Sequence, residues 1–284
     1  MKRLASEEIS RVLNIAFAED FGAGDATTRA TIGKNLKIKT NMSAREPLVV
    51  AGLDLARAAF KKLSPQIKIR ALVSDGQRVN KGKVLLQIQG SASAILTAER
   101  VALNFVQRLS GIATLAAKFV KAVAGINVKI LDTRKTTPGL RLLEKYAVAC
   151  GGGKNHRFGL HDMILIKDNH LATLKNEFPN AIAAAVQRAR KKYPRLKIEV
   201  EVDTLDQVKQ AVKAGADIIL LDNMSLKELR SAVKMIARKS KTEASGNVNL
   251  KTVRAMAETG VDFISVGAIT HSAPAVDIGL DFEF

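Results

Sequence analysis

The chain has 284 residues, which suits one large or two ordinary domains, and its 47% hydrophobic content is enough to bury a full core. No apolar run approaches the roughly 18–20 residues of a membrane-spanning helix, and the first segment, MKRLASEEISRV, is too polar for a signal peptide. The single cysteine, Cys150, excludes an internal disulfide and is typical of a reducing compartment, so we expect a cytoplasmic protein.

The chain is strongly basic, with 45 Lys and Arg against 27 Asp and Glu and a formal net charge of +18. This charge is compatible with a solvated basic surface, with nucleic-acid binding or with attraction of small polyanions into a cleft. Aromatic residues make up only 4%, without any Trp, so platforms for base stacking are scarce. The basic residues are dispersed, and we therefore favour small anionic substrates over nucleic acid.

The first part of the chain predicts a mixed arrangement of helices and strands. A helix beginning at Ser6 as its cap is followed by a glycine-punctuated loop, EDFGAGDATT. Beyond it we expect strands at 36–45, 67–73 and 84–88, a helix at 53–63 and a long helix near 97–107. Without a repeating order, these elements favour an α+β domain over residues 1–112.

From residue 128 onward, strands and helices alternate strictly. We expect strands near 128–132, 163–167, 197–202, 217–221, 242–244 and 262–266, and helices near 139–149, 180–192, 204–214, 225–239 and 249–258. Gly215 and Gly260 precede matching strand patterns and can supply left-handed helix caps. Repeated βα units favour an α/β fold, either a doubly wound sheet or a parallel barrel. Because functional-looking groups follow nearly every strand, we prefer a barrel over 113–274, with 275–284 returning to the first domain.

Cationic residues gather in the stretch from Ile130 to His170. Arg134 and Lys135 follow one short apolar run, and Lys167 ends another. Between these runs, Pro138 and Gly151 bracket a predicted helix, and the pair His156-Arg157 follows the glycine triplet 151–153. Because the carboxyl ends of parallel strands meet in one crevice, we expect these donors to surround an anion.

The order of motifs in this region is specific. DTRKTTPG, KYAV, GGGKNHRFGL and ILIKDNH follow one another, with further segments AEDFGAGDATT, TAERVALNFVQRLSGIAT, EVEVD, LLDNMS, EASGN and SVGAITHS. This ordered set resembles the quinolinate phosphoribosyltransferase family over nearly the whole chain. The resemblance implies an incomplete parallel (β/α) barrel beside an N-terminal α+β domain. It also implies transfer of phosphoribosyl from phosphoribosyl pyrophosphate to quinolinate with decarboxylation, which gives nicotinate mononucleotide for NAD biosynthesis.

The resemblance also implies roles for individual residues. Arg134, His156, Arg157 and Lys167 correspond to the quinolinate-binding groups, and Lys135 lies close to both substrates. Two planar carboxylates call for bidentate donors, which Arg supplies better than Lys. Glu201 and Asp222 correspond to the ribose-binding positions and hold Mg²⁺ indirectly, although Asp222 alone could also be a helix cap. We assign catalysis to Lys135, Glu201 and Asp222.

Phosphate binding is expected in two glycine-containing loops, since glycine lets amide groups approach an anion. The predicted contacts are Ser245, Gly246, Asn247, Gly267 and His271. Asn247 stands where many relatives have a further glycine. Arg100 lies on the long helix, and its position there alone predicts an ordinary surface residue. The resemblance instead implies that Arg100 reaches the partner's active site in a homodimer with shared active sites.

Three other functions remain open. A barrel lyase could use Lys135 or Lys167 as a Schiff-base nucleophile. A paralogue associated with molybdenum uptake shares the glycine triplet, although the intact DTRKT and IKDNH argue against it. A nucleic-acid binder lacks a supporting motif. The four His residues show no compact metal-ligand spacing and there is no dinucleotide or Walker loop, so we expect no organic cofactor.

Overall fold

The computed structural model describes residues 4–283, and the chain divides into two compact units. The first unit comprises residues 1–117, 137–152 and 272–284, and the second comprises 118–136 and 153–271. This division differs from a barrel domain at 113–274, because the helix after the first barrel strand groups with the first unit.

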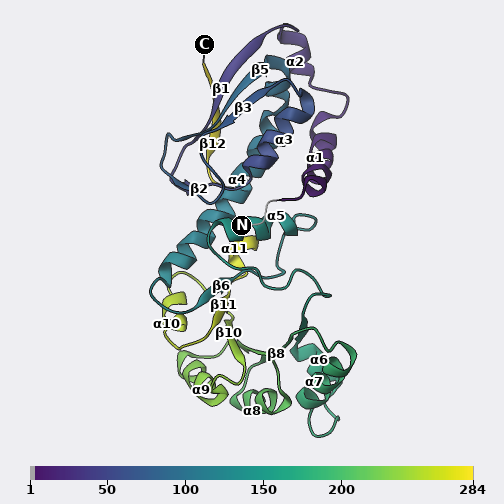
Figure 1. The fold of residues 1–284 in the computed structure, drawn as a ribbon, viewed down its shortest axis with the longest axis vertical. Helices are drawn as coiled ribbons and strands as arrows, with labels where there is room; N and C mark the ends of the chain where they lie inside the picture. Colours follow the sequence, from purple (N-terminus) through teal and green to yellow (C-terminus); the bar gives the residue numbers. More distant parts are fainter. Residues whose placement is uncertain (1–3, 284) are drawn as a thin grey trace. The chain divides into compact units, whose positions relative to one another are not determined.

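The first unit is built on an antiparallel sheet with the order β12–β1–β5–β3 (Figure 1). These strands span Ile278–Glu283, Lys37–Ala44, Val84–Ser91 and Lys68–Ala71, and a small second sheet pairs β2 (Leu48–Val49) with β4 (Arg78–Val79). The helices of this unit are α1 (Ser6–Phe21), α2 (Ala26–Thr31), α3 (Leu53–Leu63), α4 (Ala92–Ala122, its last residues in the second unit) and α5 (Arg141–Cys150). The mixed α+β character expected from the sequence is confirmed.

Two local predictions near the amino end are wrong. Ser6 is the first residue of α1 rather than its cap, and Ala5 at the cap position makes no side-chain hydrogen bond. The expected loop EDFGAGDATT is mostly helical, because α1 continues to Phe21 and α2 begins at Ala26. The side chain of Asp25 caps α2 by accepting from the amide of Thr28, which fixes the start of that helix.

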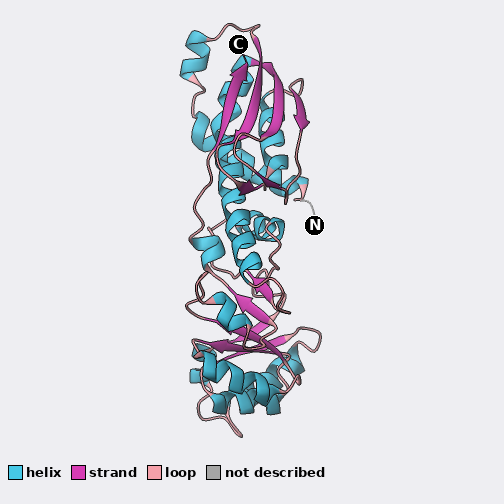
Figure 2. Ribbon diagram, turned by 90° about the vertical axis from the view of Figure 1, so that its left-hand side faces the viewer, coloured by secondary structure: helices cyan, strands magenta, loops and turns pink. Residues whose placement is uncertain are grey.

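The second unit contains a six-stranded, wholly parallel sheet among the described residues, with the order β6–β11–β10–β9–β8–β7. The strands span Lys129–Leu131, Phe263–Ser265, Lys241–Ser245, Ile218–Asp222, Ile198–Val202 and Ile164–Ile166. The helices are α6 (Asp168–Thr173), α7 (Ala181–Lys192), α8 (Leu205–Ala214), α9 (Leu226–Ile236), α10 (Val253–Ala257) and α11 (Ala268–His271). Helices α7, α8 and α9 cover one face of this sheet (Figures 1 and 2). The predicted incomplete parallel barrel is confirmed.

Alternation along β8 shows how the sequence builds this sheet. Ile198, Val200 and Val202 are buried with at most 2% exposure, as expected of side chains packed beneath helices. Glu199 and Glu201 alternate with them and therefore point to the opposite face. A buried parallel strand is usually apolar on both faces, so two carboxylates here indicate a polar site inside the sheet.

Helix ends in this unit follow local sequence signals. Thr204 caps α8 by accepting from the amide of Gln207, and Gly215 ends that helix at φ 77°, in the left-handed region as predicted. Ser225 and Glu228 form a reciprocal capping box at the start of α9. Within residues 4–283, no helix is long and apolar enough to cross a membrane.

Candidate active site

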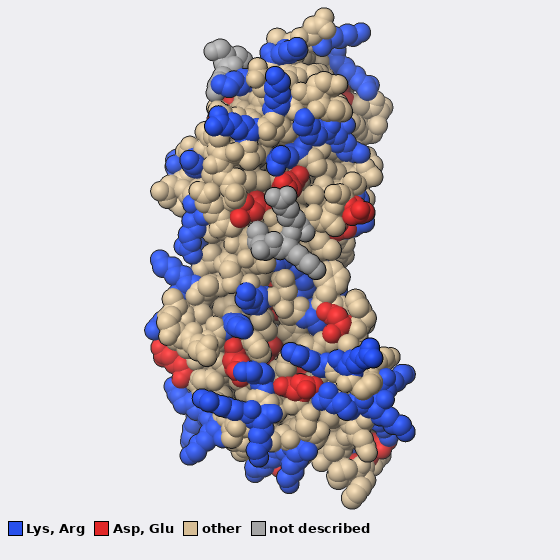
Figure 3. Space-filling view, in the orientation of Figure 1, with Lys and Arg blue, Asp and Glu red and all other residues tan. Residues whose placement is uncertain are grey.

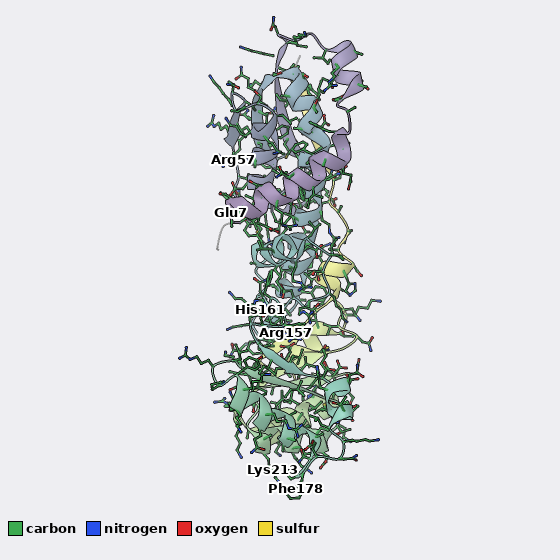
Figure 4. All side chains as sticks on the ribbon, turned by 90° about the vertical axis from the view of Figure 1, so that its right-hand side faces the viewer. Glu7, Arg57, Arg157, His161, Phe178 and Lys213 are labelled. Atoms are coloured by element: carbon green, nitrogen blue, oxygen red, sulfur yellow. The ribbon has the colours of Figure 1, made fainter. Side chains whose placement is uncertain are left out.

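A cavity of about 780 Å³ lies at the carboxyl ends of the parallel strands, entirely within the second unit. Its wall contains Thr133, Arg134, Lys135, His156, Arg157, Leu165, Lys167, Glu201, Leu220, Asp222, Asn223, Glu243, Ser245, Gly246, Asn247, Val248, Ser265, Gly267, Ala268 and His271. Figure 4 shows Arg157 and His161 at this end of the unit, with Phe178 and Lys213 at the opposite end. We call this space the strand-end cavity.

Charge is arranged differently in the cavity and on the surface. Lys and Arg gather over α7, α8 and α9 (Figure 3), as expected for a solvated basic face. In the strand-end cavity, cations alternate with carboxylates instead. There the Nζ of Lys167, at the end of β7, lies 2.8 Å from Oε2 of Glu201 on β8. Because Glu199 and Glu201 share one face of β8, the cation offsets the repulsion between their carboxylates.

The loop after β10 is shaped around Asn223. Gly246 has φ 92°, and a Cβ there would lie 2.1 Å from Oδ1 and 2.9 Å from the amide nitrogen of Asn223. Asn223 in turn donates its amide to the carbonyl of Ser245 at 3.0 Å. Only glycine permits this close approach, so the turn keeps its backbone open toward the cavity.

Asp222 ends β9 at the cavity wall. Its Oδ2 accepts from the side-chain amide of Asn223 at 2.7 Å. The helix-cap interpretation of Asp222 is wrong, because Ser225 caps α9. Asp222 is thus held at a strand end and faces the cavity, where carboxylate oxygens suit hydroxyl groups or a hard cation.

Hydrogen bonds hold the backbone of Lys135, whereas its side chain is exposed. Its backbone amide donates to Oγ1 of Thr133 at 3.0 Å, and its carbonyl accepts a hydrogen bond from Oγ1 of Thr270 at 2.7 Å. A Cβ at Gly267 would lie 3.0 Å from Cδ of Lys135 and 3.2 Å from the ring of His271. Glycine at this position therefore lets the side chains of Lys135 and His271 approach the backbone after β11.

His156, Glu199 and Glu243 form a buried cluster, of which His156 and Glu243 line the cavity. Nε2 of His156 is 3.1 Å from Oε2 of Glu199 and 3.5 Å from Oε1 of Glu243. The loop that carries His156 is held by buried Asp132, which accepts from the amide of His156 at 2.8 Å. Burial, followed by the charge of Glu243, raises the pKa of Glu199 to about 7 against the opposing influence of His156.

Two guanidinium groups complete the cationic side. Arg157 donates to the carbonyl of Met163 at 3.2 Å. Burial and the nearby charge of Arg134 lower the pKa of Arg157, so the two cations are close enough to repel one another. Such a pair is stabilised by an anion that accepts from both.

The structure brings together every site residue predicted from the sequence except Arg100, which is exposed on α4 in the first unit. The roles of these residues stay predictions, because lining a cavity shows placement alone. Sequence reasoning missed Glu243 and Asn223 as site residues. Glu243 carried a usable signal, since a charged residue in the middle of a buried parallel strand is costly unless it has a partner.

Known proteins match this chain along almost its full length. Residues 25–110 match the N-terminal domain of quinolinate phosphoribosyl transferase and residues 112–281 match its C-terminal domain. The chain belongs to the quinolinate phosphoribosyltransferase family. A probable nicotinate-nucleotide pyrophosphorylase [carboxylating] from Bacillus subtilis is 41% identical over 275 residues, which cover 96% of this chain and 93% of the relative.

Relatives and solved structures of the family agree with this assignment. A quinolinate phosphoribosyltransferase [decarboxylating] from Nicotiana glauca is 41% identical and covers 97% of this chain and 82% of the relative. The solved nicotinate-nucleotide pyrophosphorylase from Francisella tularensis superposes with a TM-score of 0.93 at 41% identity, covering 99% of this chain and 98% of that one. Human nicotinic acid phosphoribosyltransferase, at 14% identity and a TM-score of 0.64, shares the fold alone.

Proposed function

We propose that the protein transfers phosphoribosyl from phosphoribosyl pyrophosphate to quinolinate, with loss of CO₂, and so makes nicotinate mononucleotide and pyrophosphate. Membership of the family supports this reaction, and one observation on this chain carries it. The strand-end cavity combines two guanidinium groups, two lysines and three carboxylates at the ends of parallel strands. These groups match the charges of both substrates.

Arg134 and Arg157 suit the pyridine dicarboxylate. Each guanidinium presents planar donors that can hold a carboxylate through two hydrogen bonds. The mutual repulsion that lowers the pKa of Arg157 is relieved when a dianion binds between the two. A ligand with a single carboxylate would leave one desolvated cation unpaired, which costs about 1–3 kcal/mol or more.

Lys135, Glu201 and Asp222 suit the phosphoribosyl group. The ammonium of Lys135 can hold the charge that grows on the leaving pyrophosphate. The two carboxylates can accept from ribose hydroxyls and steady positive charge on the sugar. Their oxygens also suit Mg²⁺ carried in with the pyrophosphate, which would neutralise its charge. The open backbone at Gly246 and Gly267 supports phosphate binding.

The alternative chemistry of a Schiff base is less well supported. A Schiff base needs a free amine, whereas the amine of Lys167 is engaged in an ion pair with Glu201 at 2.8 Å. The names of the matched relatives also favour phosphoribosyl transfer over the molybdenum-associated function.

We further propose a cytoplasmic homodimer with shared active sites. Arg100 supports the shared site, because it is exposed on α4 and the motif around it resembles the family's substrate-binding arginine. Bacterial and plant relatives are both similar to this chain, and the Arabidopsis relative is named chloroplastic. Fractionation of the source cells would test the compartment.

The reaction is tested by incubating the protein with quinolinate, phosphoribosyl pyrophosphate and Mg²⁺. We expect equal amounts of nicotinate mononucleotide, pyrophosphate and CO₂. Nicotinate in place of quinolinate should react at least about 100-fold more slowly, because its missing carboxylate leaves one cation of the site without a partner in the transition state. Comparable turnover of nicotinate would contradict a site built for two carboxylates, and absence of product from quinolinate would refute the function.

A further inference from the structure

Two asparagines in the wall of the strand-end cavity have a backbone conformation that few side chains tolerate. Asn223 has φ 52° and Asn247 has φ 50°, so both lie in the left-handed region. Apart from glycine, asparagine is one of the few residues that adopt this region, because its short polar side chain can form local hydrogen bonds. Residues held in such conformations are concentrated at active sites and ligand-binding segments, which points to a role for both side chains.

Asn223 joins the ends of two neighbouring strands. Asp222 of β9 and Ser245 of β10 are partners in the register of the parallel sheet. The backbone amide of Asn223 donates to the carbonyl of Ser245 at 3.0 Å. In its side chain, Nδ2 donates to Oδ2 of Asp222 at 2.7 Å, and Oδ1 accepts from Nδ2 of Asn247 at 3.3 Å. Asn223 therefore links the carboxylate at the end of β9 to the loop after β10.

Asp222 fixes the orientation of both side-chain amides. A carboxylate oxygen accepts hydrogen bonds, so the NH₂ group of Asn223 faces Asp222 and its carbonyl oxygen faces away. That oxygen in turn only accepts, so the NH₂ group of Asn247 faces it. The hydrogen bonds thus run in one direction, from Asn247 through Asn223 to Asp222. We call this chain of two amides the asparagine bridge.

The asparagine bridge holds one oxygen of Asp222 and leaves the other available. Oδ2 accepts from Asn223, whereas Oδ1 forms no hydrogen bond within residues 4–283. Because the first oxygen is held, rotation of the carboxylate is restricted, and Oδ1 can accept from a hydroxyl group in the cavity. Hydrogen bonds to a charged acceptor are roughly twice as strong as neutral ones, so the orientation of this carboxylate affects binding strongly.

The other end of the bridge belongs to the loop proposed to bind phosphate. The carbonyl of Asn247 accepts from Nδ2 of Asn249 at 3.3 Å, which braces the loop. Gly246 lies directly against the bridge, since a Cβ there would lie 2.1 Å from Oδ1 of Asn223. A phosphate held by backbone amides of this loop would therefore rest on the segment that also orients Asp222.

We propose that Asn223 and Asn247 are positioning residues that tie the phosphate-binding loop to Asp222 and orient its carboxylate toward the ribose hydroxyls. This inference rests on the proposed function. Both side chains are exposed to the open cavity, so water competes with the bridge in the free protein. A bound sugar excludes this water and strengthens the hydrogen bonds. Loss of the bridge should therefore lower affinity for the phosphoribosyl group more than the stability of the fold.

Calorimetry with nicotinate mononucleotide tests the bridge, because this ligand carries both the phosphate and the ribose hydroxyls and can be titrated without Mg²⁺. Asn223→Gly removes the amide while glycine tolerates the positive φ. It should weaken binding about 10- to 100-fold, the scale of a hydrogen bond to a charged group. Asn247→Gly removes a neutral hydrogen bond and should weaken binding about 2- to 10-fold.

Kinetics supply a second measurement. In both glycine variants the KM for phosphoribosyl pyrophosphate should rise by similar factors. The affinity for quinolinate should stay within about twofold, since its proposed ligands Arg134 and Arg157 follow other strands than β9 and β10 and hydrogen bonds of the bridge do not involve them. Equal losses of affinity for quinolinate and for the nucleotide would indicate a merely structural role and overturn the proposal.

A double-mutant cycle tests whether Asn223 acts through Asp222. Asp222→Ala removes the carboxylate, so adding Asn223→Gly to it should weaken nucleotide binding by less than about twofold further. If the losses of the two single variants multiply instead, Asn223 acts independently of Asp222, and the proposal is overturned. Affinity within twofold of normal in Asn223→Gly alone would overturn it as well.

Ala237→Gly is the matched control, because Ala237 also has a positive φ, 47°, and lies outside the cavity wall. It should leave both affinities unchanged. The melting temperature of the two asparagine variants should change by no more than about 2 °C. If Asn223→Gly does not fold, Asn247→Gly and its combination with Asp222→Ala give the same test. Failure of the unaltered protein to bind quinolinate and the nucleotide is a different outcome, since it refutes the proposed function itself.

Discussion

Replacement of Lys135 by alanine separates catalysis from stability most sharply. The side chain is exposed, and its ammonium forms no ion pair or hydrogen bond within residues 4–283. The backbone hydrogen bonds with Thr133 and Thr270 are unaffected by truncation. The free energy of unfolding should therefore change by no more than about 0.5 kcal/mol. Turnover should fall about 10²- to 10³-fold, because losing one preorganised donor to a developing charge costs about 2.7–4 kcal/mol.

The assay is single-turnover formation of nicotinate mononucleotide, together with thermal unfolding. Lys227→Ala, which removes another exposed lysine, from α9, is the control and should leave both unchanged. The affinity for quinolinate should change less than turnover, since the lysine acts mainly on the leaving group. A loss of turnover below about threefold, or one matched by a large loss of stability, would remove Lys135 from the catalytic groups.

Two further substitutions test the scaffold of the site. Gly246→Ala should cost about 1–3 kcal/mol of stability and weaken binding of phosphoribosyl pyrophosphate, because a Cβ would overlap Asn223 at a positive φ; unchanged melting and affinity would contradict this. Hydrogen bonds from Lys241 and Thr242 outweigh partial burial and lower the pKa of Asp262 below 3.8. The stabilisation of the folded state is present above a pH of 3.8 and is lost as the pH falls through the lowered pKa. Asp262→Asn should therefore lower the free energy of unfolding by about 1.5–3 kcal/mol at neutral pH and by progressively less in acid.

The parallel sheet was predictable because its signals are local. Most strands are short, largely apolar runs followed by a helix, and α8 carries a local cap at each end, Thr204 and Gly215. Repetition of this unit then limits the topology to a few parallel arrangements. The polar residues at the strand ends fall in one cavity for the same reason, since all strands of a parallel sheet end at the same edge.

The hydrophobic pattern of α5 does not predict that this helix belongs to the first unit. Its apolar face shows that the helix is buried but not which elements cover it. The structure shows fully buried Glu144 of α5 accepting from Arg108 of α4 at 2.9 Å, a contact between residues far apart in sequence. Glu243 was missed for a similar reason, because its partner His156 belongs to another segment. Pairings of this kind become visible only in three dimensions.

If the active site is shared between the two subunits of a homodimer, mixing two inactive variants should restore activity. Arg100→Ala and Lys135→Ala should each be nearly inactive as homodimers. If Arg100 serves the partner's cavity, a mixed dimer carries both defects at one site and neither at the other. Mixing the inactive variants should then restore up to about a quarter of normal activity, since half of the dimers are mixed and half of their sites are intact. Subunit exchange must be verified separately with labelled chains. If exchange occurs and no activity returns, Arg100 acts within its own chain, and the shared site is excluded.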